Sequence, residues 1–451
     1  MGPMGDRSAR MLERLAGADV RVGEWRAVLR FVAALFLLLA AYYTLKVVRE
    51  PLILASAGAV SRSYARAVQA GLLVLVVPLY SALANRTSPA RLVQFVFLFF
   101  IVSLLAFAAC GLAGMGIGFA FFVWLGIFST MSIAQFWSLA NDLLTEAEGE
   151  RLFPLVAIGG TFGAIAGSQI AARGIAALGP YGLMLLAAAF IALCMVLTAA
   201  AVRSWPVRDR QGIADETTGA AAVRAVRDPR SGFTLLLRDR YLLLIAGAVL
   251  LVNVVNTTGD YMLAELVSRA ADAAAAGTAD TGAARQAYIG AFYGDFQTAI
   301  SVLTTLAQLF LVARLFHWAG VEQCLFVLPV FVLFGYGSTA LWPLLGLLAA
   351  VKIFENSTEY SLQNTLQQAL FLPTTRDAKY KAKAAIDTFV VRAGDVGSAA
   401  LVYVGTLLGL GVRGFALVNV VIGLGWIVLV RRLASRHQAI SRLSPPGVSR
   451  S

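Results

Sequence analysis

Histidine, cysteine and charged residues are scarce in this chain, and each scarcity argues against a class of function. The 451 residues include two histidines, three cysteines and 14% charged residues, whereas soluble domains carry roughly 25% charged residues. His317 and His437 fall in segments that we place in the cytoplasm, so we expect no metal site and no histidine proton relay within a membrane. Cys110, Cys194 and Cys324 are isolated in apolar runs, which predicts packing roles without disulfides.

Motifs of soluble nucleotide-binding enzymes and metalloproteases are missing as well. The chain has no GxxxxGK[ST] loop, no His-Glu-x-x-His and no convincing nucleophile elbow. Residues 409–414 do fit GxGxxG, but that fingerprint requires a preceding strand, and here it falls in a turn between two apolar runs. We therefore expect no enzyme, no bound cofactor and no metal.

Apolar runs are what the chain has in abundance. Hydrophobic residues make up 59% of it, and runs of about 20 apolar residues, the length that crosses a bilayer, recur from one end to the other. This pattern predicts an all-α polytopic membrane protein with twelve transmembrane helices. The expected spans begin near Arg26, Ala65, Arg91, Met115, Pro154, Pro180, Tyr241, Tyr288, Val321, Thr339, Ala384 and Gly414.

The net charge of +12 is informative through its distribution. Lysine and arginine concentrate in the segments that we place inside, which predicts that both termini are cytoplasmic in a bacterial inner membrane. No soluble basic domain is expected, so nucleic acid is not an expected partner. The expected partners are the lipid bilayer and a small-molecule solute, and we expect a monomer.

A polar, arginine-rich stretch divides the chain into six spans plus six. The expected parts are a cytoplasmic tail over 1–25, a six-helix bundle over 26–202, a cytoplasmic loop over 203–240, a second six-helix bundle over 241–432 and a cytoplasmic tail over 433–451. The fourth span ends on Ser-Leu-Ala-Asn at 138–141 and the tenth on Ser-Leu-Gln-Asn at 361–364. This echo indicates two pseudo-symmetric bundles of the major-facilitator type, with chance similarity between short motifs as the alternative. An alanine-rich excursion over 263–286 has no assigned function.

Three glycines repeat every four residues in the fifth span, at Gly159, Gly163 and Gly167. Small residues at this spacing allow two helices to approach closely. The pattern predicts a helix-packing face rather than a ligand loop.

Charged residues within the expected spans are the main functional signal. Lys46, Arg49 and Glu50 lie near the end of the first span on one helical face. Each charge at membrane depth costs about 2.5–3.5 kcal/mol, so such residues usually face a protein interior or a water-filled cavity. Lys46 and Glu50 are spaced for a same-helix ion pair. A solute pathway needs such residues, whereas a membrane anchor does not.

The second half of the chain carries its own set. Lys352, Glu355 and Glu359 share one face of the tenth span, and Lys352 and Glu355 are spaced for an ion pair. Other charged residues expected within spans are Asp260, Asp295, Asp387, Arg392 and Asp395. Acidic residues thus outnumber basic ones in the expected spans. That excess fits proton coupling or a less anionic solute at least as well as nucleotide exchange.

These residues form our candidate site. The candidate substrate-binding residues are Lys46, Arg49, Glu50, Gln135, Trp137, Asn141, Asn253, Asn256, Lys352 and Arg392. The candidates for proton or charge coupling are Asp260, Glu355, Glu359, Asp387 and Asp395. The alternative is that the ion pairs only hold the bundles together and that the amides hydrogen-bond between helices.

Two cytoplasmic segments of opposite charge predict a gate. Glu150 and Arg151 end an acidic loop after the fourth span, and Arg376, Lys379 and Lys381 belong to a basic segment after the tenth. The two could attract each other and close the cytoplasmic side. The alternative is that the basic segment only sets the topology.

Several stretches between 43 and 400 resemble the nucleotide translocases, the ATP:ADP antiporters of plastids and intracellular bacteria. The likeness rests on Leu-Lys-Val-Val-Arg-Glu at 45–50, Phe-Trp-Ser-Leu-Ala-Asn at 136–141, Glu-Arg-Leu-Phe-Pro-Leu at 150–155, Glu-Tyr-Ser-Leu at 359–362 and Lys-Ala-Lys-Ala-Ala-Ile-Asp at 381–387. The resemblance implies a nucleotide site, and Lys46 and Arg49 match it. Asn256 and Asp260 stand where the family has an acidic and a basic residue, and Asp395 stands where it has a lysine.

The resemblance and the residues together predict an alternating-access transporter. It would exchange nucleotides or a related anionic metabolite across the inner membrane. One alternative is a proton-coupled carrier of a nucleoside, an amino acid or a drug-like cation. A membrane scaffold or sensor that transports nothing is the other.

Overall fold

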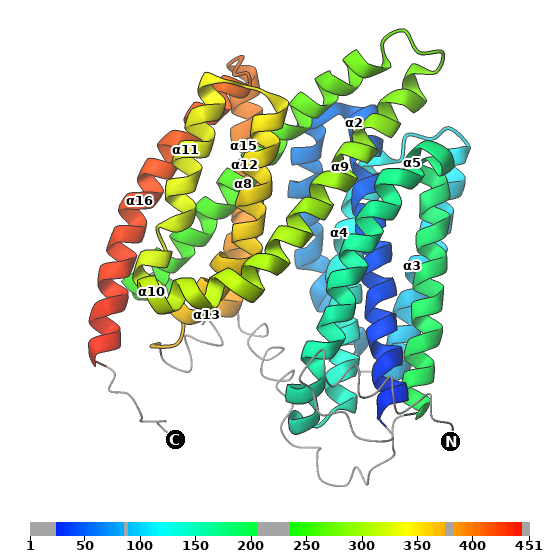
Figure 1. Ribbon diagram of the computed structural model, residues 1–451, viewed down its shortest axis with the longest axis horizontal. Helices are drawn as coiled ribbons and strands as arrows, with labels where there is room; N and C mark the ends of the chain where they lie inside the picture. The colour runs from blue at the N-terminus through cyan, green and yellow to red at the C-terminus, as the bar shows by residue number, and fades with distance from the viewer. Residues whose placement is uncertain (1–23, 85–88, 205–234, 375–381, 444–451) are drawn as a thin grey trace. The chain divides into compact units, whose positions relative to one another are not determined.

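The computed structural model describes residues 24–84, 89–204, 235–374 and 382–443, which are almost entirely helical and contain no strand (Figure 1). Seven helices in this part of the chain are long and apolar enough to cross a membrane. This agrees with the expected all-α class. The count of twelve spans and their division into two symmetric bundles stay predictions.

The helices of the described residues have the following bounds. In chain order they are α2 (Trp25–Ala84), α3 (Pro89–Leu112), α4 (Gly118–Leu143), α5 (Glu146–Ser204), α8 (Arg240–Ala275), α9 (Thr281–Leu306), η1 (Ala307–Leu311), α10 (Val312–Cys324), α11 (Val327–Leu341), α12 (Leu345–Thr358), η2 (Glu359–Gln363), α13 (Asn364–Leu370), α14 (Lys383–Ala385), η4 (Ile386–Val390), α15 (Val391–Leu407) and α16 (Val412–Leu443). The segments named η are π-helical, a wider coil that is frequent at functional sites.

Glycine kinks divide the longest helices. Gly58 in α2, Gly179 in α5 and Gly320 in α10 have φ values of 73°, 64° and 71°, a region that only glycine adopts without strain. Two of these kinks lie directly before the expected span starts at Pro180 and Val321.

The expected starts of the second and tenth spans differ from the helix starts in the structure. The second helical part of α2 follows Gly58 rather than beginning near Ala65. Thr339 lies in α11, and the next helix begins at Leu345. These helix boundaries are hard to predict from the sequence, because each helix continues through polar residues that are buried in the fold.

Two compact units divide the chain. The first contains Met1–Ser56, Leu73–Asp215 and Ala274–Thr298, and the second contains Ala57–Leu72, Glu216–Ala273 and Ala299–Ser451. Residues 57–72 of α2 therefore pack with the second unit. The expected division into bundles over 26–202 and 241–432 stays a prediction.

The first unit is held by aromatic packing and by the glycine face of α5. The Trp124 ring lies parallel to that of Phe128, with 5.5 Å between ring centroids. A Cβ added to Gly163 would overlap the backbone of Phe36 in α2. The Thr44 hydroxyl donates to the Gly167 carbonyl at 3.1 Å. The predicted close-packing role of these glycines is confirmed.

The second unit has a core of α8, α11, α12 and α16. Trp426 and Tyr336 are fully buried there, and α11 packs along α16. The Tyr241 hydroxyl donates to the Leu370 carbonyl at 2.7 Å. The Thr258 hydroxyl, in α8, donates to the Asn419 side chain of α16 at 2.6 Å.

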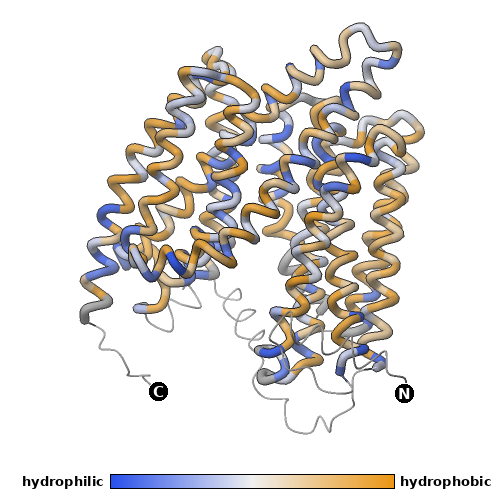
Figure 2. Tube along the Cα trace, viewed as in Figure 1, coloured by the Kyte–Doolittle hydropathy of each residue, from blue (hydrophilic) through white to orange (hydrophobic). Residues whose placement is uncertain are grey.

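Hydrophobic residues predominate along most of the helices (Figure 2). Large hydrophobic residues such as Leu75, Phe99, Leu309 and Phe334 are more than half exposed. Exposed apolar surface on this scale is what a lipid-facing helix presents. The protein is an integral membrane protein.

Two segments singled out in the sequence are helix–turn–helix connections. In the alanine-rich stretch, α8 runs to Ala275 and α9 begins at Thr281. The GxGxxG stretch turns at Gly409, with φ 72°, between α15 and α16. It follows a helix, so it lacks the strand that a dinucleotide site requires.

Candidate functional site

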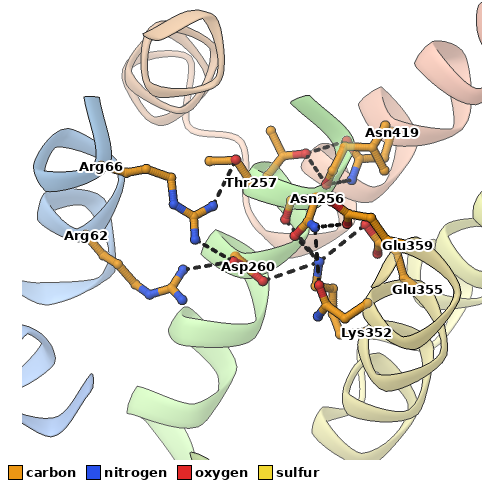
Figure 3. Close-up of polar contacts among 12 residues, drawn as sticks. Arg62, Arg66, Asn256, Thr257, Asp260, Lys352, Glu355, Glu359 and Asn419 are labelled. Atoms are coloured by element: carbon orange, nitrogen blue, oxygen red, sulfur yellow. Dashed lines mark hydrogen bonds and ion pairs between the residues drawn. The ribbon is translucent and has the colours of Figure 1, made fainter. Parts of the chain in front are cut away.

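Lys352 is the centre of a polar cluster in the second unit (Figure 3). Its side chain, on α12, is fully buried. The ammonium donates to the Asn256 carbonyl at 3.0 Å and to the Asn256 side-chain oxygen at 2.9 Å. It also lies 3.3 Å from carboxylate oxygens of Asp260 and of Glu355. The expected Lys352–Glu355 ion pair is confirmed.

Three basic side chains contact the carboxylate of Asp260. Lys352 contacts Oδ1, whereas Arg66 lies 2.8 Å and Arg62 lies 3.5 Å from Oδ2. Arg62 and Arg66 are one turn apart on α2, so both reach toward α8 from the same helical face. The second terminal nitrogen of Arg66 donates to the Thr257 hydroxyl at 2.9 Å (Figure 3).

Glu355 and Glu359 extend the cluster along α12 and into η2. The Tyr336 hydroxyl donates to Glu355 at 2.6 Å. The Asn256 amide donates to Asn356 at 3.2 Å and also to Glu359, the first residue of η2. The structure therefore brings together five of the expected site residues: Asn256, Asp260, Lys352, Glu355 and Glu359.

The sequence analysis missed Arg62 and Arg66. The expected start of the second span near Ala65 lies after Arg62. The signal that could have found the pair is the i, i+4 arginine spacing in Ser-Arg-Ser-Tyr-Ala-Arg at 61–66. With both arginines in a helix and in the cluster, basic residues nearly match acidic ones in number. The expected acidic excess is therefore smaller than the sequence indicates.

Arg392 and Asp395 form a second polar group in the same unit. They pair within α15 at 3.3 Å. Asn253 of α8 donates to the carbonyl of Val391. A Cβ on Gly394 would lie 2.9 Å from the Asn253 amide nitrogen, so glycine permits this close approach of α8 and α15.

Asp387 has a hydrogen-bond partner outside the Lys352 cluster. It is an exposed residue of η4, and it accepts a hydrogen bond from Gln367 at 2.8 Å. Two coupling candidates, Glu359 and Asp387, thus occupy π-helical segments.

The expected triad of the first unit lies on α2. Arg49 and Glu50 are buried and form an ion pair of 2.6 Å. The Arg49 guanidinium stacks over the Phe122 ring at 4.1 Å from its centroid, a favourable arrangement for a planar cation. Lys46 is half-buried, with its ammonium 5.2 Å from the centroid of Tyr43.

The other candidates of the first unit lie on α4. Gln135 is buried, and Asn141 is exposed near the end of the helix. Trp137 is half-buried and packs edge-on against Phe136 and Phe153. Among the three, Trp137 has the surroundings of a packing residue.

The predicted cytoplasmic gate stays a prediction. Arg376, Lys379 and Lys381 lie outside the described residues, as does the side chain of Glu150. Arg151, at the start of α5, pairs with Glu24 at 2.8 Å.

Solved structures with a similar fold are solute transporters. The crystal structure of the nucleoside transporter NupG matches with a TM-score of 0.59 and 14% identity, covering 92% of this chain and 99% of that one. The peptide transporter POT in complex with sulfate matches with a TM-score of 0.63 and 13% identity, covering 93% of this chain and 95% of that one. No curated protein matches the chain in sequence.

The chain is an integral membrane protein with buried charge among its helices, and it shares the fold of these solved structures. The family model of the TLC ATP/ADP transporters matches residues 120–437. The chain belongs to the TLC ATP/ADP transporter family.

Proposed function

We propose that the protein exchanges anionic metabolites across the bacterial inner membrane, with adenine nucleotides as its first candidate substrates. The observation that carries the proposal is the convergence of Arg62, Arg66 and Lys352 on the single carboxylate of Asp260. Guanidinium groups bind phosphate oxygens through charge-assisted, often bidentate hydrogen bonds. Membership of the TLC ATP/ADP transporter family supports a phosphate-bearing substrate.

The expected site residues take roles in this proposal. Lys46 and Arg49 in the first unit and Arg392 in the second provide further positive charge for the substrate. Alternating access would proceed through twelve spans, with both termini cytoplasmic and one chain as the transporting unit. Exchange requires that substrate changes the balance between inward-facing and outward-facing states.

Replacement of Lys46 by alanine tests the proposal. We expect exchange of radiolabelled ADP against internal ATP in proteoliposomes to fall by at least about tenfold, because one charge-assisted contact contributes roughly 1.5–3 kcal/mol. Lys46→Arg should retain part of the rate, since it keeps the charge. The control is Arg413→Ala, an exposed position at the start of α16.

The outcomes of this test are distinct. A wild-type protein that exchanges no nucleotide under any gradient would refute the nucleotide version. Normal exchange by the Lys46→Ala protein would refute the role of that lysine and leave the transported class intact.

Glu359 favours a second candidate function, proton-coupled uptake of a less anionic solute. Among the described residues, its side chain is held by the Asn256 amide rather than by an ion pair. A carboxyl group in such surroundings can carry a proton between the two faces of a transporter.

Glu359→Gln separates the two functions, because glutamine preserves the hydrogen bond to Asn256 and removes the titrating group. For proton coupling, uptake driven by a pH gradient should be lost, while exchange at equal pH continues. Gradient-driven uptake that survives the substitution would exclude Glu359 as the proton carrier.

A further inference from the structure

The Arg62 and Arg66 side chains differ from Lys352 in how they could meet a solute. Lys352 has no exposed side-chain surface, whereas the side chains of Arg62 and Arg66 are 8% and 21% exposed. Four oxygen atoms already surround the Lys352 ammonium, which has three protons to donate. The hydrogen-bonding capacity of Lys352 is therefore used by protein groups. The two arginine side chains are the cations of this cluster that a solute could reach.

Asp260 occupies the position that an anionic ligand would take. Both arginines address the same oxygen, Oδ2, while Oδ1 faces Lys352. Two guanidinium groups on one oxygen resemble a clamp on a phosphate or carboxylate oxygen. If Oδ2 left the arginines, Asp260 would keep Lys352 as its partner, so its charge would not be stranded.

We propose that Arg62 and Arg66 form an anion subsite, and that Asp260 is a built-in competitor which fills it in the absence of solute. A phosphate or carboxylate group of the solute displaces Oδ2 from the two guanidinium groups. This inference rests on the proposed anion exchange and adds the residues that select for charge.

Competition between Asp260 and a solute for the two arginines has a measurable consequence that a purely structural ion pair would not have. Any solute that binds must replace the Arg62–Asp260 and Arg66–Asp260 contacts, so its affinity is lowered by the strength of that internal pairing. Removal of the competitor should then strengthen binding of anions. Removal of either arginine should weaken it. A neutral solute gains nothing from the arginines and should respond to neither change.

The experiment measures binding of ADP, inorganic pyrophosphate and adenosine to the full-length protein in detergent by isothermal titration calorimetry. We expect Arg66→Gln and Arg62→Gln to raise the Kd for ADP and pyrophosphate by about tenfold or more. Arg66→Lys should have a smaller effect, because it keeps the charge but loses the fork of donors. Asp260→Asn should lower the Kd for both anions by about tenfold. The control is Arg269→Gln, an exposed arginine of α8 paired with Glu265.

The arginine variants and the Asp260→Asn variant are expected to change the Kd for anions in opposite directions. This difference distinguishes an anion subsite from a purely structural role. A damaged protein binds less tightly, so tighter binding by the Asp260→Asn protein would not follow from misfolding. Wild-type protein that binds ADP while Asp260→Asn binds it equally or more weakly would overturn the subsite and leave anion exchange standing. Wild-type protein that binds neither ADP nor pyrophosphate would overturn both proposals.

Should Asp260→Asn fail to fold, the arginine variants decide the question. Each leaves Asp260 paired with Lys352. A loss of pyrophosphate affinity with unchanged melting temperature supports the subsite. Equal losses for ADP, pyrophosphate and adenosine, or no loss for any of them, overturn it.

Discussion

Replacement of Lys352 by methionine is expected to leave little folded transporter. The side chain is fully buried and lies 3.3 Å from Asp260 and from Glu355. Methionine has a similar length, so the loss is one of charge and hydrogen bonds rather than of volume. Removing one partner of a buried ion pair typically costs about 3–5 kcal/mol, because the other charge stays buried without compensation. Whole domains are stable by only about 5–15 kcal/mol.

Glu355 is the group most affected by this change. Glu355 would keep the hydrogen bond from the Tyr336 hydroxyl at 2.6 Å, whereas Asp260 would keep two cations, Arg62 and Arg66. A second substitution, Glu355→Gln, should therefore recover part of the stability lost in Lys352→Met. Such coupling between contacting residues is usually about 0.5–3 kcal/mol.

The measurement is the melting temperature and monodisperse fraction of each purified variant in detergent. The matched control is Lys383→Met, a half-buried lysine of the same unit that donates to Gln368. A Lys352→Met protein that melts with the wild type would show that the cluster contributes no stability. A double variant as unstable as the sum of its two changes would show that Lys352 and Glu355 act independently.

The contacts that the sequence predicted correctly follow local helical periodicity. Lys352 and Glu355 are three residues apart on one helix, so their pairing could be predicted from α-helical geometry alone. The close-packing role of Gly163 followed from the four-residue spacing in the same way. All-helical membrane architecture followed from the length of the apolar runs.

Contacts between distant parts of the chain could not be derived this way. Asp260 meets Arg62 and Arg66 across almost two hundred positions of sequence, and helical periodicity carries no information about which helices become neighbours. The kink at Gly58 also concealed these arginines, because a glycine with positive φ joins two helices without a polar loop.

Pairing partners in the first unit show a related limit. Spacing predicts an ion pair between Lys46 and Glu50, which stays a prediction, but it does not predict the 2.6 Å contact between Glu50 and its neighbour Arg49. Adjacent residues on a helix do not normally face each other. The long guanidinium side chain reaches back to Glu50 while it lies over Phe122 of α4. Packing against α4 thus accompanies a contact that helical spacing alone does not predict.

Gly163→Leu is expected to prevent correct packing of α5 on α2 and to abolish transport. A Cβ at Gly163 would overlap the Phe36 backbone, which cannot rotate away as a side chain could, so we expect a cost of about 3 kcal/mol or more. The same α2 carries Lys46 and Arg49, so displacing it moves proposed substrate contacts. Melting temperature and exchange rate measure the effect. Gly425→Ala is the control, since a Cβ there meets nothing within 4 Å; equal behaviour of the two variants would contradict close packing at Gly163.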